Sequence, residues 1–203
     1  MPFYANRILP RLIDRGMRNA TLAKYRPRVP PLARGRVLEI GLGSGLNIPL
    51  YTAGVSQLFG LEPSAHLRGL AAEPAARARF PVTLLDAGAE AIPLEAASVD
   101  CVVSTWTFCS IPGIEQALQE VRRVLKPDGR LLFLEHGLAP DPDVARTQAW
   151  LLPVFRGLAG CALNRPMDRL IAGAGFRLGV LEKGYLEGPR FLAYHYIGEA
   201  VPA

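Results

Sequence analysis

Short apolar runs alternate with segments of helical periodicity between residue 36 and the C-terminus. The runs predict strands at residues 37–40, 57–61, 81–85, 99–105, 130–135, 176–182 and 191–197. The intervening segments predict helices at residues 46–53, 64–79, 114–125, 143–162 and 168–174, the fourth broken at Pro153. Strict alternation is typical of a parallel sheet with helices on both faces. No long helix separates the last two strands, so we expect an α/β, doubly wound, mostly parallel seven-stranded sheet with an antiparallel C-terminal edge strand.

The first 35 residues carry a different pattern. Apolar residues recur between residues 8 and 22 at spacings of three to five, with arginines between them. This spacing predicts one amphipathic helix, or two short ones, over residues 7–26. Pro27, Pro30 and Pro31 then end the helical segment. We therefore divide the chain into a basic helical extension, residues 1–35, that acts as a lid with its apolar side inward, and a main domain, residues 36–203.

Positive charge is concentrated in this extension. The formal net charge of the chain is +5. Residues 1–36 contain nine Lys and Arg but a single acid, Asp14, whereas the rest of the chain is mildly acidic. Peripheral contact with an anionic membrane through residues 1–36 fits this asymmetry. We do not expect nucleic acid as a partner, because Phe3, Tyr4 and Tyr25 leave few aromatic rings on which bases could stack.

Cysteine spacing and hydropathy indicate the cellular compartment and the kinds of site that we expect. The three cysteines, Cys101, Cys109 and Cys161, are widely spaced and form no CxxC motif, so we expect no metal site and no disulfide framework. This pattern favours a reducing cytoplasm. No apolar run reaches the roughly 18 residues of a membrane span, so we expect no transmembrane segment. The oligomeric state stays open.

A glycine-rich turn follows the first strand of the main domain. Glycines at positions 41, 43 and 45 allow a sharp turn and close approach to a ligand. A P-loop needs Lys-Ser/Thr after its last glycine, but Leu46 and Asn47 follow here. The third glycine also lacks the GxGxxG spacing of dinucleotide sites. Two interpretations of the turn remain: a tight turn without a ligand, and a loop that binds S-adenosylmethionine. The segment that begins at Glu39 resembles the E/DxGxGxG motif of such loops.

An acidic residue ends the second strand, in the segment Gly60-Leu61-Glu62-Pro63. It lies about 20 residues after the glycine loop, where a carboxylate can accept hydrogen bonds from both ribose hydroxyls. Together with the loop, Glu62 predicts a ligand that contains adenosine.

By these motifs the chain resembles the class I S-adenosylmethionine-dependent methyltransferases, from about Arg36 to the C-terminus. Further matches lie at residues 98–103 and 120–135, and they are typical of the small-molecule (methyltransferase type 11) branch. Segments 105–110, 133–137 and 161–165 are similar to the methyltransferase-like family whose members methylate alkyl thiols. The resemblance implies a Rossmann-like fold, S-adenosyl-L-methionine as cofactor, S-adenosyl-L-homocysteine as product and a small-molecule substrate.

The resemblance also implies a set of cofactor-binding positions. Residues 88–93 correspond to a D-A-E-x-L-P segment that lines the adenine, but Gly88 replaces the aspartate. Backbone groups of Ala89 can still read the adenine edge, and Asp86 or Glu90 can compensate for the lost carboxylate. The predicted cofactor-binding residues are Glu39, Gly41, Gly43, Gly45, Asn47, Glu62, Pro63, Gly88, Ala89, Glu90 and Thr105.

The acceptor site is less specified by the sequence. His136 follows the fifth strand at the ligand-binding edge, and its ordinary pKa of about 6.5 suits a general base; a structural histidine is the alternative. A thiol acceptor needs little or no base. The motifs of DNA methyltransferases, Asn/Asp-Pro-Pro-Tyr/Phe and a Pro-Cys nucleophile, are absent.

Three functions therefore remain. The first is methyl transfer to a small lipophilic acceptor such as a thiol, for which the apolar segment 150–155 provides a cover. The second is a phospholipid or quinone methyltransferase that works at a membrane surface. The third is a non-catalytic cofactor- or RNA-binding protein.

Overall fold

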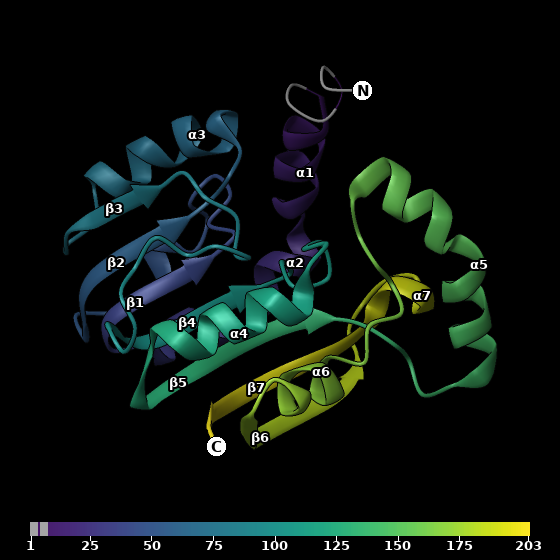
Figure 1. Ribbon diagram of the computed structural model, residues 1–203. Coiled ribbons are helices and arrows are strands. Elements are labelled where there is room, and N and C mark those ends of the chain that lie inside the picture. Colours follow the sequence, from purple (N-terminus) through teal and green to yellow (C-terminus); the bar gives the residue numbers. More distant parts are fainter. Residues whose placement is uncertain (1–3, 5–7) are drawn as a thin grey trace.

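The computed structural model describes residue 4 and residues 8–203, which form a seven-stranded sheet flanked by helices (Figure 1). The strands are β1 (Gly35–Ile40), β2 (Val55–Leu61), β3 (Val82–Leu85), β4 (Val99–Thr105), β5 (Leu125–His136), β6 (Phe176–Tyr185) and β7 (Tyr194–Pro202). The helices are α1 (Leu9–Met17), α2 (Ala20–Tyr25), α3 (Ala65–Ala76), α4 (Ile114–Val124), α5 (Pro142–Ala159), α6 (Met167–Gly173) and α7 (Arg190–Ala193). Three short 3₁₀ turns are η2 (Arg26–Arg28), η3 (Pro30–Leu32) and η4 (Ile48–Leu50).

The strand order is β3-β2-β1-β4-β5-β7-β6. The first five strands in this order pair in parallel, while β7 pairs antiparallel with both β5 and β6. The predicted fold class is thus confirmed, with β7 inserted between β5 and β6 so that β6 forms the edge. Because the chain order reverses between β1 and β4, a crevice opens at their carboxyl ends, where doubly wound sheets bind ligands.

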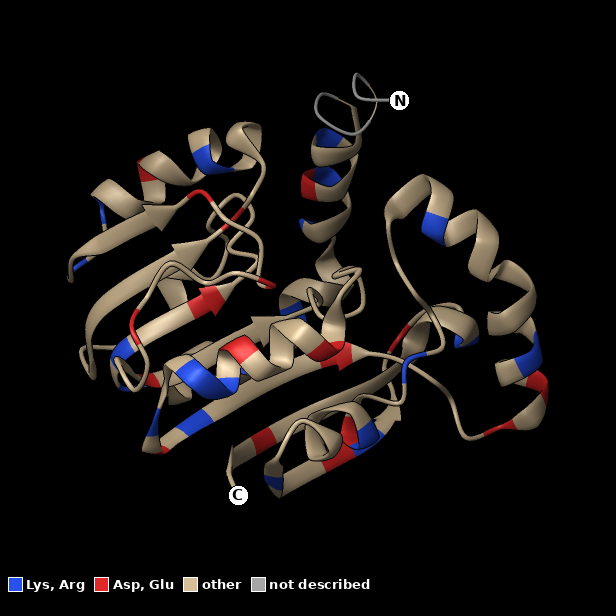
Figure 2. Cartoon of the chain, in the orientation of Figure 1, with Lys and Arg blue, Asp and Glu red and all other residues tan. Residues whose placement is uncertain are grey.

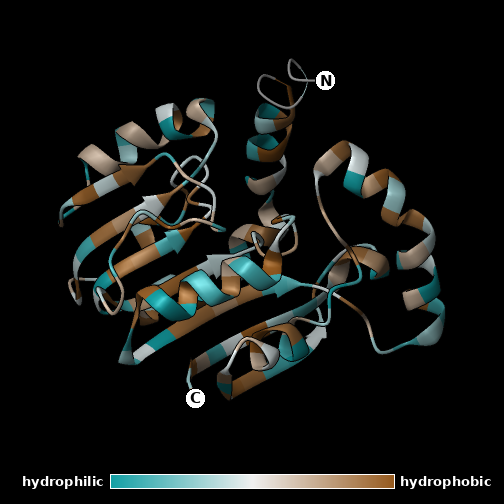
Figure 3. Cartoon of the chain, viewed as in Figure 1, coloured by the Kyte–Doolittle hydropathy of each residue, from teal (hydrophilic) through white to brown (hydrophobic). Residues whose placement is uncertain are grey.

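Two apolar cores hold the sheet between its helices. Alternate residues of β1 point to opposite faces, so Leu38 enters one core and Val37 the other. The first core contains the apolar sides of α4 and α6, and the second contains residues of α3 and of the segment around Val29. Figure 3 shows the apolar strands in brown beneath these helices. Each fully buried Val, Leu or Ile contributes about 1.5–3 kcal/mol.

Two helix predictions were wrong. Residues 46–53 form only the 3₁₀ turn η4, held by bonds such as that from Leu50 N to Asn47 O at 2.9 Å. The chain is extended at Tyr51, whose hydroxyl is held by the buried Glu39 carboxylate, so the helix does not continue. Conversely, α5 runs through Pro153 without a break. Pro153 and Ala149 are exposed, so water can bond the carbonyl that the proline leaves free.

Two smaller boundaries also differ from the predictions. Residues 191–193, expected to begin the last strand, belong to the short helix α7, and β7 starts at Tyr194. Strand β5 starts at Leu125, five residues before the predicted strand, but its register with β4 passes from Leu125 to Arg130, so residues 126–129 lie outside the ladder.

The N-terminal extension forms two short helices, α1 and α2, as one of the two alternatives predicted. The first helix ends at Met17, and Asn19 caps the second, because its side-chain oxygen accepts a 2.9 Å hydrogen bond from Leu22 N. Figure 2 shows basic residues (blue) on α1, which stands apart from the sheet. Residue 7, the first of the predicted helical range, lies outside the described residues. Among the described helices, none has the length and apolarity that crossing a membrane requires.

Candidate active site

A cavity of about 310 Å³ lies at the carboxyl ends of β1, β2 and β4; we call it the loop cavity. Ten of the eleven predicted cofactor-binding residues line it: Glu39, Gly41, Gly43, Asn47, Glu62, Pro63, Gly88, Ala89, Glu90 and Thr105. Gly45 does not, because it is buried against α3, where an added Cβ would lie 2.9 Å from Pro74 Cγ. The sheet topology thus gathers residues from four separate turns around one space.

Glu62 fixes the glycine loop. Its carboxylate accepts hydrogen bonds from Gly43 N at 3.0 Å and from Ser64 N at 2.8 Å. Burial raises the pKa of Glu62. Gly43 has a φ of +60°, and an added Cβ would meet only Gly41 O, at 4.0 Å, so the space above the loop is free for a ligand. Gly41 is different, since its Cβ would collide with Thr107.

A buried polar network forms another wall of the loop cavity. Glu39 accepts hydrogen bonds from Asn47 Nδ2 at 2.7 Å and from the Tyr51 hydroxyl at 2.8 Å. Asn47 Nδ2 also donates to Thr105 Oγ1 at 2.9 Å. Burial raises the pKa of Glu39 to about 7, against the lowering effect of these donors. The network holds the Asn47 and Thr105 side chains in fixed orientations beside the cavity.

The extension contributes residues that the sequence analysis did not single out. Ile13, Asp14, Met17 and Arg26 all line the loop cavity. The Arg26 guanidinium donates to Asn47 Oδ1 at 3.0 Å and to Met17 O at 2.8 Å, and its side chain is only 8% exposed. No sequence motif marks this arginine among its basic neighbours.

Asp14 joins the extension to the glycine loop. The Ser44 hydroxyl donates a short hydrogen bond to the Asp14 carboxylate, and Arg18 forms a 2.9 Å ion pair with the same group. Burial raises the pKa of Asp14, but the bonds from Arg18 and Ser44 lower it by more. Asp14 is the extension's single acid, and this contact occupies it.

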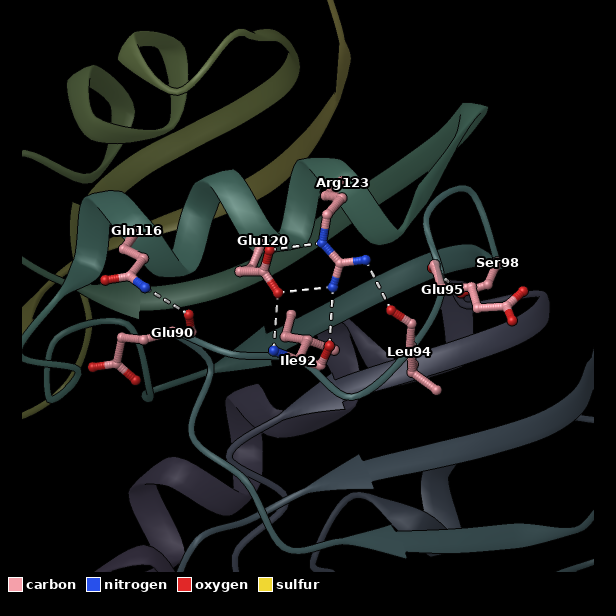
Figure 4. Close-up of polar contacts among 8 residues, drawn as sticks. All are labelled: Glu90, Ile92, Leu94, Glu95, Ser98, Gln116, Glu120 and Arg123. Atoms are coloured by element: carbon pink, nitrogen blue, oxygen red, sulfur yellow. Dashed lines mark hydrogen bonds and ion pairs between the residues drawn. The ribbon is translucent and has the colours of Figure 1, made fainter.

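The loop that carries Gly88, Ala89 and Glu90 is fastened to α4 (Figure 4). Arg123 donates to the carbonyls of Leu94 at 2.8 Å and Ile92 at 2.9 Å, while Glu120 accepts from Ile92 N at 3.0 Å. Glu90 Oε1 accepts from Gly113 N at 3.2 Å. Asp86, the other residue considered for the adenine, pairs with Arg68 at 2.5 Å and does not line the cavity.

A second cavity of about 630 Å³ contains His136; we call it the histidine cavity. It adjoins the loop cavity, because Ile13, Met17, Trp106 and Ser110 line both. Much of the remaining lining is apolar, including Leu22, Phe155, Ala159, Leu186 and Leu192, while Asn19, Thr21 and Glu187 add polar groups. The predicted base therefore lies in the neighbouring cavity and not among the predicted cofactor residues.

Trp106 stands between the two cavities in a strained backbone conformation, with a φ of +52°. Its indole nitrogen donates to His195 Nε2 at 2.9 Å, and the Arg26 guanidinium lies 5.1 Å from its ring centre. Burial lowers the pKa of His195 to about 4, so this imidazole is a neutral acceptor at pH 7. The tryptophan is thus held from both sides.

His136 has two cysteine neighbours. Its Nε2 lies 2.7 Å from Cys161 Sγ, and its Nδ1 is buried without a hydrogen-bond partner among the described residues. The candidate ligand atoms of Cys109, His136 and Cys161 all lie within 4.8 Å of one another. Cys109, His136 and Cys161 are far apart in the sequence, and for that reason the sequence predicts no metal site. The fold nevertheless brings the three side chains together.

Comparisons with known proteins agree with this geometry. The family model described as Methyltransferase domain matches residues 38–133. The chain is 32% identical over 151 residues to the human protein named Thiol S-methyltransferase TMT1B, covering 71% of this chain and 62% of that protein. The rat protein of the same name is 30% identical, with 81% and 70% covered. The Ubiquinone/menaquinone biosynthesis C-methyltransferase UbiE of Syntrophotalea carbinolica is 32% identical, with 69% and 58% covered.

Solved structures share the fold. A SAM-dependent methyltransferase from Thermotoga maritima has a TM-score of 0.69 at 21% identity and covers 98% of this chain and 99% of its own. A chain from the Haloferax volcanii complex between the Trm112 methyltransferase activator and a methyltransferase has a TM-score of 0.71 at 19% identity, with 94% of both chains covered. At these identities the likeness shows the fold alone.

Proposed function

The chain belongs to the class I S-adenosylmethionine-dependent methyltransferases, and from this premise we propose that it methylates small lipophilic thiols. One observation carries the proposal: the loop cavity and the apolar histidine cavity adjoin at Trp106 and Ser110. A methyl donor in the first cavity and an acceptor in the second can then meet at their junction. The relatives named as thiol S-methyltransferases support the choice of sulfur.

The loop cavity fits the cofactor. When bound, S-adenosylmethionine supplies a methyl group already activated by its sulfonium charge. The open space above Gly43 admits a ligand close to the backbone, and the Glu62 carboxylate keeps lone pairs that can accept ribose hydroxyls. Backbone groups of Ala89, with Glu90 beside them, provide donors and acceptors for the adenine edge. The Glu39–Asn47–Thr105 network supplies fixed polar groups on another side.

The histidine cavity supports a lipophilic acceptor. Its largely apolar lining favours an apolar acceptor, and such an acceptor would displace water from the reacting centre when it binds. A thiol has a pKa of about 8.5, so a few per cent is already thiolate at pH 7 and a strong base is unnecessary. The positioning of two reactants supplies most of the catalysis in such a transfer.

We also propose that residues 1–35 form a lid on the domain of residues 36–203. Arg26, Asp14 and Met17 provide direct contacts with the loop cavity. A lid of this kind would shield the reaction from water and hold Asn47 in place through Arg26. The three cysteines are free, which supports a reducing, cytoplasmic setting for the enzyme.

An acceptor screen that measures S-adenosylhomocysteine tests the proposal. The panel contains alkanethiols of increasing chain length, the matched alkanols, a demethylated quinol and a phospholipid with a primary amine. We expect turnover with thiols only, with KM falling as the alkyl chain grows. Turnover with the quinol alone would contradict the proposal, and cofactor binding without any turnover would favour a non-catalytic role.

A second candidate is a quinone or phospholipid methyltransferase at a membrane surface. The UbiE relatives point to it, as do exposed apolar residues on α1 and α5, including Leu12, Trp150 and Leu158. Vesicles with and without anionic lipid distinguish the two. Vesicle binding together with turnover of a vesicle-borne quinol would favour this candidate over thiol methylation.

A further inference from the structure

Three metal-binding side chains meet at the edge of the histidine cavity. Cys109 follows β4, His136 ends β5, and Cys161 follows α5. Their ligand atoms all lie within 4.8 Å of one another, and all three residues line the cavity. The chain thus assembles two sulfurs and one imidazole nitrogen from three distant segments.

Two cysteine sulfurs and one histidine nitrogen are a donor set that is typical of zinc. Two cysteine thiolates and one histidine nitrogen form a three-ligand zinc site of the kind found in enzymes that keep the fourth position open. The two thiolate charges balance the charge of Zn²⁺, so the metal can lie among apolar neighbours without a net buried charge. Arg165 donates hydrogen bonds to the carbonyls of Phe108 and Ile111, so it does not need the two thiolates as partners and they are free to bind the metal.

We propose that Cys109, His136 and Cys161 bind a zinc ion whose fourth position faces the histidine cavity and takes the sulfur of the acceptor thiol. The inference rests on the proposed function and deepens it, since it specifies how the acceptor sulfur is held. In tetrahedral coordination the ligand atoms lie roughly 3.5–3.8 Å apart. The contact of 2.7 Å between His136 Nε2 and Cys161 Sγ would open to that distance on binding.

The site would change the chemistry of the acceptor in a defined way. A thiol that binds zinc gives up its proton to water and remains as a nucleophilic thiolate at neutral pH. A bond then forms between this sulfur and the methyl carbon, while the bond from that carbon to the sulfonium sulfur breaks and leaves its electron pair on that sulfur. The product is a neutral thioether, a weaker ligand than the thiolate, so it leaves the metal.

The position of the cluster fits this role. The histidine cavity meets the loop cavity at Trp106 and Ser110, and Cys109 Sγ lies 3.5 Å from the Ser110 hydroxyl. An acceptor sulfur bound to the open position of the zinc would therefore face the loop cavity, where the methyl donor is proposed to bind. His136 acts here as a ligand, in place of the general base expected from the sequence.

Metal content and an optical probe test the site. The purified chain should hold about one zinc per molecule, and Co²⁺ in its place should give thiolate-to-metal and tetrahedral d–d absorption bands. Cys109→Ser and Cys161→Ser should each weaken Co²⁺ binding by roughly 100-fold or more, because each removes a direct ligand. Cys101→Ser is the matched control, since Cys101 is buried in β4 outside both cavities and should leave Co²⁺ affinity unchanged.

The open position has its own readout. Addition of 1-hexanethiol to the Co²⁺-loaded chain should shift the d–d bands, whereas 1-hexanol should not. Binding of S-adenosylhomocysteine, measured by calorimetry, checks that each variant is folded. An unchanged spectrum with hexanethiol would overturn the assignment of the fourth position.

Other outcomes separate this proposal from the proposed function. Absence of bound metal with a Cys109–Cys161 disulfide, detected by mass spectrometry, would overturn the zinc site. Full thiol turnover by chain freed of metal with a chelator would also overturn it while leaving thiol methylation intact. Metal binding without methylation of any thiol would refute the proposed function and leave a zinc site of another role.

Discussion

Arg26 Nη1 donates a 3.0 Å hydrogen bond to Asn47 Oδ1, and this bond joins the N-terminal extension to the wall of the loop cavity. Asn47 in turn holds Glu39 and Thr105 through its amide nitrogen. One arginine outside the glycine motif thus fixes the orientation of an amide inside the site. The basic N-terminal extension therefore forms part of the wall of the loop cavity.

Arg26→Ala should weaken S-adenosylmethionine binding by about 10-fold to 100-fold, in line with about 1.5–3 kcal/mol for a hydrogen bond to a charged group. The reason is that Asn47 loses the partner that orients it. Calorimetric titration measures the change. Arg28→Ala is the matched control, because Arg28 pairs at the surface with Glu182 and does not line the cavity. Equal losses in both variants would refute the specific role of Arg26.

Gly43→Val should abolish measurable cofactor binding in a folded chain. The added side chain would occupy the open space above the loop, and a φ of +60° disfavours a β-branched residue by about 1 kcal/mol or more. Gly69→Val is the control, since Gly69 lies in α3 with nothing within 4 Å of an added Cβ. Glu62→Ala should also weaken binding, because it frees Gly43 N and removes the carboxylate proposed to accept the ribose hydroxyls. Normal affinity in either site variant would disprove the cofactor assignment.

Glu39 should make the chain less stable as the pH rises. Burial raises its pKa from an ordinary 4.5 to about 7, so between these values the folded state retains a proton that the unfolded state has lost. Unfolding then becomes easier with rising pH, by about 1.4 kcal/mol for each pKa unit. Glu39→Gln should be destabilised less, relative to the wild type, at pH 8 than at pH 5. Denaturant titrations at both pH values give the comparison; a constant difference would contradict the raised pKa.

Arg123→Ala should loosen the loop that carries Gly88, Ala89 and Glu90. The substitution removes the bonds to the carbonyls of Ile92 and Leu94, each contributing roughly 1.5–3 kcal/mol. Amide hydrogen exchange should accelerate across residues 88–98, and cofactor affinity should fall by less than in Glu62→Ala. Arg77→Ala, which breaks only an exposed pair with Glu73, serves as the control. Unaltered exchange in the loop would show that α4 does not fasten it.

The contents of the histidine cavity could be predicted from motifs only in part. The place of His136 after a predicted strand indicates a role at the ligand-binding edge, and the structure puts this residue in a cavity beside the predicted cofactor residues. The sequence does not predict that Cys161 contacts His136, because α5 separates the two residues along the chain. The path of α5 in space is not encoded in local residue spacing. Whether the helix breaks at Pro153 was likewise a question of solvent exposure, which the chain sequence does not show.

The sequence by itself determined the alternating sheet and most of the loop cavity. Hydrophobic period and turn chemistry act over a few residues, and parallel strands bring their carboxyl ends to one edge, so Gly43 and Glu62 had to meet. Tertiary structure alone decided that Arg26 reaches Asn47 and that Cys109, His136 and Cys161 share one space. Such contacts depend on how whole elements pack across the core, and no local period or spacing records that packing.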